Sequence, residues 1–142
     1  MKAHKWVQKV NGFTLIGVLV AIGVAAILMG IAVPQFYAVL PGIRLSSAAR
    51  QVATDLQLAR MQAISTRAPL TVAFVPPTGV YTFGANNRDL NQLYPGTTIT
   101  AVVGGDPTFT TVGAANVTII TVTNNGVDKQ VWVNAAGKIF TQ

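Results

Sequence analysis

The sequence of 142 residues contains no cysteine and no glutamate, and its only histidine is His4. Without cysteine there is no disulfide framework, so the fold must depend on packing alone. Glutamate, cysteine and histidine supply most nucleophile–base pairs, general acids and transition-metal ligands. Four scattered aspartates do not replace them. These absences predict a protein that is not an enzyme and that holds no metal or other cofactor.

Two of the aspartates lie in sequences that could contribute to a calcium site. Asp89 is close to Asn86 and Asn87, and Asp106 follows two glycines. Carboxylate and amide oxygens are typical ligands of Ca²⁺. The same residue types are also ordinary turn formers, and we expect turns at both positions.

Charged residues make up only 10% of the sequence, and none occurs at positions 10–43. The apolar part of this stretch, positions 13–33, would be about 30 Å long as a helix, which matches the hydrocarbon thickness of a bilayer. The backbone of a single span must satisfy its own hydrogen bonds, and an α-helix does so. We therefore predict a transmembrane helix over residues 13–42.

Lys2, Lys5 and Lys9 precede the span, and they are three of the ten basic residues that give the chain a formal net charge of +6. Basic residues beside a span favour the cytoplasmic side, so we expect the N-terminus in the cytoplasm and the C-terminal part beyond the membrane. A secretory signal peptide also begins with a basic segment. The apolar run is longer than in such a signal, however, and no polar mature start follows it.

The pentapeptide GFTLI, which begins at Gly12, lies between the basic leader and the apolar run, and Pro34 follows 22 positions after Gly12. This arrangement resembles the prepilin signal of type IV pilins and type II secretion pseudopilins. The resemblance implies that a prepilin peptidase cuts between Gly12 and Phe13 and that the new Phe13 amine is methylated. Residues 1–12 would then be a leader peptide, which takes His4 with it and leaves seven basic and four acidic residues.

Gly17 departs from the family pattern, which has a glutamate at this position. In pilins that carboxylate is thought to pair with the N-terminal amine of a neighbouring subunit during assembly, because an unpaired charge in the membrane is costly. The resemblance leaves three alternatives for a subunit without it. The chain could lie at a filament tip, assemble sparsely, or be a degenerate copy that assembles poorly.

The prolines predict two irregularities in the apolar helix. Pro34 removes one helical hydrogen bond and is expected to kink the helix. Pro41 is followed by Gly42, and a proline also disfavours helical geometry in the residue before it. We therefore expect a bend or short break near residues 40–42.

An amphipathic helix is predicted over residues 43–68. Its apolar residues at positions 45, 48, 52, 56, 59 and 63 follow spacings of three and four, which place them on one face. This face is expected to pack on a sheet. The pattern D-L-x-x-A-R-x-x-A-I, which begins at Asp55, resembles the GspH/FimT branch of the pseudopilins.

From residue 69 the apolar pattern changes to a period of two, which indicates strands. We expect strands at 69–75, 80–83, 97–103, 109–112, 117–123, 127–133 and 138–141, with a polar loop at 86–91. The turn sequence Asn124-Asn125-Gly126 predicts a hairpin between two of them. Residues 69–142 should thus form an antiparallel β head domain. The whole chain is expected to have an α+β, type IV pilin-like architecture.

The resemblance implies a non-enzymatic minor pilin or pseudopilin that primes, tips or joins a type II secretion pseudopilus or a type IV pilus. Its partners would be other pilins or pseudopilins, the prepilin peptidase, the inner membrane and a secretion or pilus assembly platform. Before assembly it would cross the bacterial inner membrane once, with a cytoplasmic N-terminus and a periplasmic C-terminal domain.

A FimT-like minor pilin that binds DNA for uptake in natural transformation is the alternative. That branch carries a G-R-x-R motif near its C-terminus, where this chain has the sequence GKIF with one cation, Lys138. Arg88, Lys129 and Lys138 are the candidate nucleic-acid contacts. DNA affinity grows with the number of phosphates neutralised, so solvated surface charges are the simpler interpretation of three isolated cations.

Overall fold

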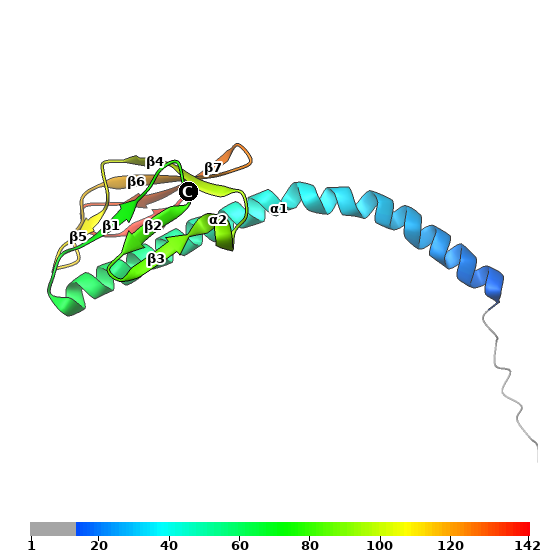
Figure 1. The fold of residues 1–142 in the computed structure, drawn as a ribbon, viewed down its shortest axis with the longest axis horizontal. Helices are drawn as coiled ribbons and strands as arrows, with labels where there is room; N and C mark the ends of the chain where they lie inside the picture. Colours follow the sequence, from blue (N-terminus) through cyan, green and yellow to red (C-terminus); the bar gives the residue numbers. More distant parts are fainter. Residues whose placement is uncertain (1–13) are drawn as a thin grey trace, which may run out of the picture. The chain divides into compact units, whose positions relative to one another are not determined.

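The computed structural model describes residues 14–142 of the chain, which fall into two compact units. The first unit ends at Ala38, and the second, the head, covers Val39–Gln142. Helix α1 (Leu15–Thr66) begins in the first unit and ends in the head (Figure 1). Residues 1–12, the predicted leader, and Phe13 lie outside the described residues.

The part of α1 in the first unit is apolar and exposed. Leu15 is 81% exposed and Ile27 is 67% exposed. An 18-residue window of α1 has a mean hydropathy of 2.8, and none of it is buried within the chain. By length and composition this helix can cross a membrane.

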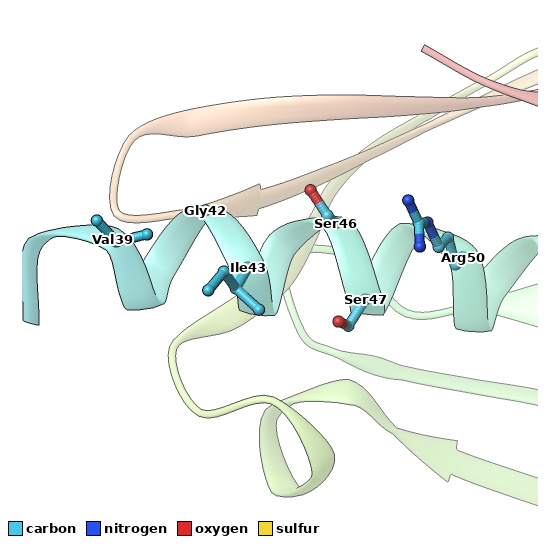
Figure 2. A pocket seen from close by; sticks show the side chains of 6 residues that line it. All are labelled: Val39, Gly42, Ile43, Ser46, Ser47 and Arg50. Atoms are coloured by element: carbon cyan, nitrogen blue, oxygen red, sulfur yellow. The ribbon is translucent and has the colours of Figure 1, made fainter. Parts of the chain in front are cut away.

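Helix α1 continues through Pro41 and Gly42, so the expected short break near residues 40–42 is wrong (Figure 2). Pro41 cannot donate to the carbonyl of Tyr37, but this removes only one hydrogen bond of the helix. The next turns are held in place by burial in the head, where Leu45 is 1% exposed and Ala48 fully buried. The kink at Pro34 and a bend near Gly42 stay predictions.

The head contains two antiparallel sheets of four strands each, with the orders β3-β2-β1-β5 and β4-β6-β7-β8 (Figure 1). Their strands are β1 (Leu70–Phe74), β2 (Val80–Phe83), β3 (Asn86–Asp89), β4 (Thr97–Val103), β5 (Thr108–Phe109), β6 (Thr118–Asn124), β7 (Val127–Val133) and β8 (Ile139–Thr141). The expected hairpin between β6 and β7 is confirmed, with Asn124 opposite Val127. Asn125 and Gly126 in its turn both have positive φ, as a two-residue hairpin turn of type I′ requires.

The expected polar loop at 86–91 is wrong, because residues 86–89 form strand β3 and Leu90–Leu93 form the short helix α2. Residues 86–89 are extended because their backbone pairs with β2, where Arg88 lies opposite Tyr81. Asp89 caps α2 through a 2.9 Å hydrogen bond from the Asn91 N–H, and Leu90 is fully buried. Tertiary pairing and burial thus override a polar local sequence.

The expected edge strand at 109–112 is shorter than predicted. Strand β5 ends at Phe109, and the chain then turns, with a hydrogen bond of 2.9 Å from the Gly113 N–H to the Thr110 carbonyl. Gly113 has a φ of +80°, which suits glycine and ends an extended conformation.

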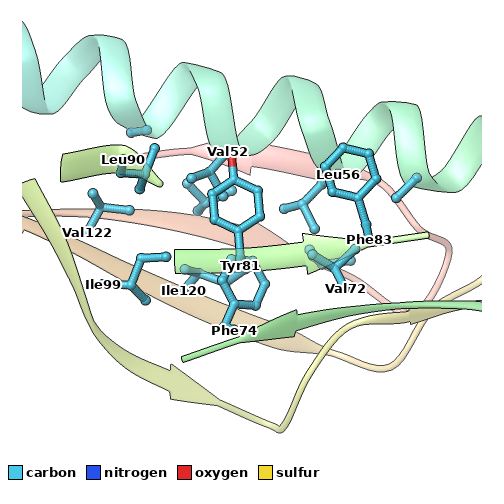
Figure 3. Packing of buried hydrophobic residues seen from close by; sticks show 14 of the residues in the cluster. Val52, Leu56, Val72, Phe74, Tyr81, Phe83, Leu90, Ile99, Ile120 and Val122 are labelled. Atoms are coloured by element: carbon cyan, nitrogen blue, oxygen red, sulfur yellow. The ribbon is translucent and has the colours of Figure 1, made fainter. Parts of the chain in front are cut away.

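The predicted apolar face of α1 forms one side of the core. Its members are at most 1% exposed: Leu45, Ala48, Val52, Leu56, Ala59 and Ala63. Val52 and Leu56 face Tyr81 and Phe83 on β2 (Figure 3). Each fully buried Leu, Val or Phe side chain contributes about 1.5–3 kcal/mol, and packing of this kind holds together a chain without cysteine.

Candidate functional site

Gly12 and Phe13, the predicted processing and methylation residues, lie outside the described part of the chain. The neighbouring Thr14 caps the start of α1. Its Oγ1 accepts a hydrogen bond of 3.3 Å from the Gly17 N–H, which satisfies one of the free N–H groups of the first turn.

Gly17 is the third residue of α1, three positions after its cap. In a capping box this position holds Glu or Gln, whose side chain bonds back to the N–H of the capping residue. Gly17 offers no such group. A Cβ at Gly17 would lie 3.2 Å from the Thr14 Oγ1, so a larger residue would fit only if the hydroxyl shifted by a few tenths of an ångström.

Asp55 is a buried carboxylate on α1, with an exposed fraction of only 2%. The phenol of Tyr81 donates a hydrogen bond to its Oδ2 at 2.6 Å, and the Gln51 amide donates one to Oδ1 at 3.2 Å. The Nε of Arg88 lies 3.6 Å from the same Oδ2. A buried charge is costly unless it is paired and hydrogen-bonded, so these contacts join α1 to β2 and β3.

Tyr81 acts in this network as a hydrogen-bond donor. Its burial and, second, its hydrogen bond to Asp55 raise the pKa of the phenol well above its usual value. The phenol therefore stays protonated at physiological pH. The role of the network is structural, and residues 14–142 contain no group of three or more His, Cys, Asp or Glu that could hold a metal ion.

The sequence did not identify Asp55 as the centre of a network. The available signal was a single acidic residue within an otherwise apolar, buried helical face. Arg88, in contrast, was proposed as a nucleic-acid contact, and its guanidinium faces Asp55. Part of its charge is thereby neutralised within the fold, which weakens support for that prediction.

The other three aspartates hold turns and loop ends. Asp89 caps α2 by accepting from the Asn91 N–H, and Asp106 Oδ1 accepts from the Phe74 N–H at 3.1 Å. Asp128 Oδ1 accepts from the Thr123 hydroxyl at 2.6 Å. These are the hydrogen bonds that aspartate makes in turns and at strand ends.

The three candidate nucleic-acid contacts do not form one cluster. Arg88 lies on β3 of the first sheet, whereas Lys129 lies on β7 of the second sheet and Lys138 directly precedes its strand β8. Lys138 lies opposite Asn134, since the Asn134 N–H donates to its carbonyl. Lys129 lies on β7, five residues before Asn134, which is a distance of roughly 17 Å along the strand. These two lysines are too far apart to contact one phosphate.

Lys138 instead lines a groove with Arg60, which the sequence did not single out. This groove has a volume of about 380 Å³. Its walls include Arg60, Met61 and Ile64 from α1 and Gly137, Lys138 and Ile139 from the chain that leads into β8. We call it the Arg60–Lys138 groove. A second depression of about 390 Å³ is lined by α1 alone, between Val39 and Arg50 (Figure 2).

Two glycines shape the Arg60–Lys138 groove. Gly113 and Gly137 have positive φ, and a Cβ on either one would lie 3.0 Å from the Arg60 Nε. That Nε donates a hydrogen bond of 2.9 Å to the Gly113 carbonyl. The close approach of the two loops therefore holds the Arg60 guanidinium in one place.

Replacing Gly137 with alanine is expected to lower the free energy of unfolding by about 2–4 kcal/mol. The new Cβ would lie 1.9 Å from the Gly113 carbonyl oxygen, and positive φ is unfavourable for alanine. Gly126→Ala is the matched control, because Gly126 has a φ of +76° and nothing within 4 Å of its Cβ position. It should cost only about 1–2 kcal/mol. Thermal unfolding of the full chain in detergent micelles, followed by circular dichroism, measures the stability of both variants. Equal losses of stability in the two variants would show that the Gly137 Cβ does not clash with the Gly113 carbonyl.

Comparison with known proteins gives two matches to protein families. Residues 48–140 match the family of the type II transport protein GspH, and residues 8–33 match the prokaryotic N-terminal methylation motif. No curated protein sequence matches the chain.

Two crystal structures of the type IV minor pilin FimU from Pseudomonas aeruginosa strain PAO1, in space groups P21 and P65, resemble this structure. Their TM-scores are 0.59 and 0.57, each with 19% sequence identity over 69% of this chain. The matches cover 87% and 92% of the two FimU chains. The likeness confirms the expected α+β fold, in which a long N-terminal helix packs on an antiparallel β head.

Proposed function

Since the chain belongs to the GspH family of type II transport proteins, we propose that it is a minor subunit that primes, tips or sparsely joins a type II secretion pseudopilus or a type IV pilus. The observation that carries the proposal is the apolar half of α1, whose side chains are exposed from Leu15 onward. An apolar surface of this extent requires a membrane or other helices around it. A filament with bundled helices at its centre provides that environment.

Before assembly the subunit crosses the inner membrane once, in this proposal. The three lysines of the leader keep the N-terminus in the cytoplasm, and the head lies in the periplasm. The prepilin peptidase cuts after Gly12, and the Phe13 amine is methylated, which is consistent with the methylation motif matched at residues 8–33. The membrane anchor stays on the mature chain.

Gly17 supports a position at the tip or a sparse distribution along the shaft. The residue supplies no carboxylate for the amine of a neighbouring subunit, and it supplies no reciprocal bond for the Thr14 cap. A subunit at the tip has no neighbour ahead of it whose N-terminal amine must be neutralised. A subunit within the shaft would leave one amine unpaired, which limits its number.

Filaments sheared from cells are expected to contain the processed chain in a few copies per filament. The measurement is quantitative mass spectrometry of purified filaments, which reports both copy number and the N-terminal residue. Gly17→Glu is the matched variant and is expected to raise the copy number severalfold, because it restores the missing carboxylate. Filaments that never contain the chain, with or without the glutamate, would contradict the proposal.

Deletion of the gene separates this proposal from DNA uptake. Loss of protein secretion or of pilus formation supports the structural role. Loss of natural transformation with secretion and piliation intact supports the FimT-like alternative, for which Lys138 and Lys129 remain the candidate contacts.

A further inference from the structure

Strand β8 is the last strand of the second sheet, and its outer edge is open. Gln130 on β7 and Gln142 exchange both of their backbone hydrogen bonds, at 3.1 and 2.9 Å. Bonded and non-bonded residues alternate along an antiparallel pair, so Phe140 also bonds to β7. The N–H and C=O groups of Ile139 and Thr141 therefore point away from β7. Within residues 14–142, no loop or side chain bonds to these groups.

The other three edges of the two sheets are covered or polar. On β4, the Ile99 N–H donates to the Thr78 carbonyl at 2.9 Å. Phe109 on β5 pairs with Ala115 through a β-bridge. Strand β3 consists of polar residues only (Asn86–Asp89), and polar edges discourage pairing with other strands. Strand β8 is thus the edge at which another strand can be added.

The Arg60–Lys138 groove lies between this open edge and α1. Met61 and Ile64 line it on the helix, and Ile139 lines it on β8. Met61 is 60% exposed and Ile64 is 43% exposed, so the sheet leaves an apolar strip of α1 uncovered. Open backbone groups beside an apolar strip match an extended polypeptide, which offers backbone hydrogen bonds and alternating side chains.

We propose that the outer edge of β8 binds an extended strand of a different protein, which lies in the Arg60–Lys138 groove and continues the second sheet. Two residues of that strand exchange backbone hydrogen bonds with Ile139 and Thr141. Directly opposed residues share a face of a sheet. The side chain opposite Ile139 therefore points toward Met61 and Ile64, and it is aliphatic. Binding of such a strand does not depend on the proposed function.

A second copy of this chain does not fit the edge. Its own α1 lies beside its own β8, as the groove between Met61 and Ile139 shows. Pairing of two β8 strands would therefore bring a second helix to the groove. A helix with its side chains is about 10–12 Å in diameter, whereas the groove has a volume of about 380 Å³. A strand without a helix behind it is the occupant that fits.

The test is a titration of the isotope-labelled full chain in detergent micelles with the peptide acetyl-Thr-Val-Thr-Val-Thr-amide. A second peptide is N-methylated at both valines, which removes the N–H groups that would face β8. It should bind about tenfold more weakly, because two backbone hydrogen bonds are lost. A third peptide, N-methylated at the third and fifth residues, carries the same number of methyl groups on its other edge. Its affinity should stay within about twofold of the unmodified peptide.

Hydrogen exchange followed by NMR reports the new hydrogen bonds directly. At saturation with the unmodified peptide, the amides of Ile139 and Thr141 should exchange about tenfold more slowly, because a bonded N–H exchanges only when the bond opens. The Phe140 amide is the internal control. It bonds to β7 with or without the peptide, so its exchange should not change.

Thr141→Pro should lower the affinity for the unmodified peptide about fivefold, because proline removes one outward N–H group. The fold should tolerate this change, since Thr141 is exposed and proline is accommodated on the outer side of an edge strand. Thr141→Val is the matched control, because it keeps the N–H and the shape of the side chain. The Trp132 indole signal should be the same in both variants, which would show that β7 and β8 stay paired.

The proposal would be overturned by equal binding of the unmodified and valine-methylated peptides, or by equal binding of the two Thr141 variants. Peptide binding that leaves the exchange of Ile139 and Thr141 unchanged would also contradict it. A slowing of exchange that rises with the concentration of the chain alone would assign the edge to a second copy and exclude the proposed partner.

Discussion

Replacing Gly12 with valine is expected to leave the whole chain uncut, as a membrane-resident precursor that still carries residues 1–12. The resemblance places the cut directly after Gly12, where the family pattern has a glycine with no side chain beside the bond. A β-branched residue there adds bulk next to the scissile peptide. Mass spectrometry of the membrane fraction gives the N-terminus, and processing should fall from nearly complete to undetectable.

The control for this experiment is Gly23→Val, which makes the same change within the apolar part of α1. A Cβ at Gly23 would have nothing within 4 Å in the chain, so the variant should be processed as usual. A Gly12→Val chain that still begins at Phe13 would show that processing does not follow the prepilin pattern. It would also remove the reason for assigning residues 1–12 to a leader.

Asp55→Ala is expected to lower the free energy of unfolding of the head by about 3–5 kcal/mol, the usual cost of removing one partner from a buried charged network. The change leaves the Tyr81 phenol and the buried Arg88 Nε facing an empty space. The Arg88 side chain is 42% exposed, and solvent reduces what its ion pair contributes. Most of the loss should therefore come from the hydrogen bonds and the burial of Tyr81.

Three further variants make the Asp55 experiment specific. Tyr81→Phe should cost only about 1–2 kcal/mol, and the double variant should lose less than the sum, since both remove the same hydrogen bond. Thr54→Ala changes the adjacent, exposed position of α1, and it should stay within about 0.5 kcal/mol of the original chain. Chemical denaturation in micelles measures the free energy of unfolding of the four variants and of the original chain. If Asp55→Ala unfolds at the same denaturant concentration as Thr54→Ala, the network does not stabilise the head.

Local periodicity predicted the elements that depend on one segment. The three- and four-residue spacing from Leu45 to Ala63 identified the buried face of α1, and Asn125-Gly126 identified the hairpin of β6 and β7. In both cases the residues that determine the geometry are close in sequence, so the pattern contains the necessary information.

The features that the sequence did not predict depend on residues far apart along the chain. Strand β3 exists because Arg88 pairs with Tyr81, and α1 passes Pro41 because the turns after it are buried in the head. Arg60 and Lys138 line the same groove only because α1 packs beside the loop that precedes β8. No local propensity reports such contacts, so neither the network of Asp55 nor the groove could be derived before the structure.

The unbroken passage of α1 through Pro41 and Gly42 has a mechanical consequence. A flexible loop at this position could be extended at little cost in free energy. A helix rises only 1.5 Å per residue and lengthens only when its turns open. Opened residues extend to about 3.3–3.6 Å each. Under tension the first turn to yield should be the one between Tyr37 and Pro41, where a proline already leaves one carbonyl without its donor.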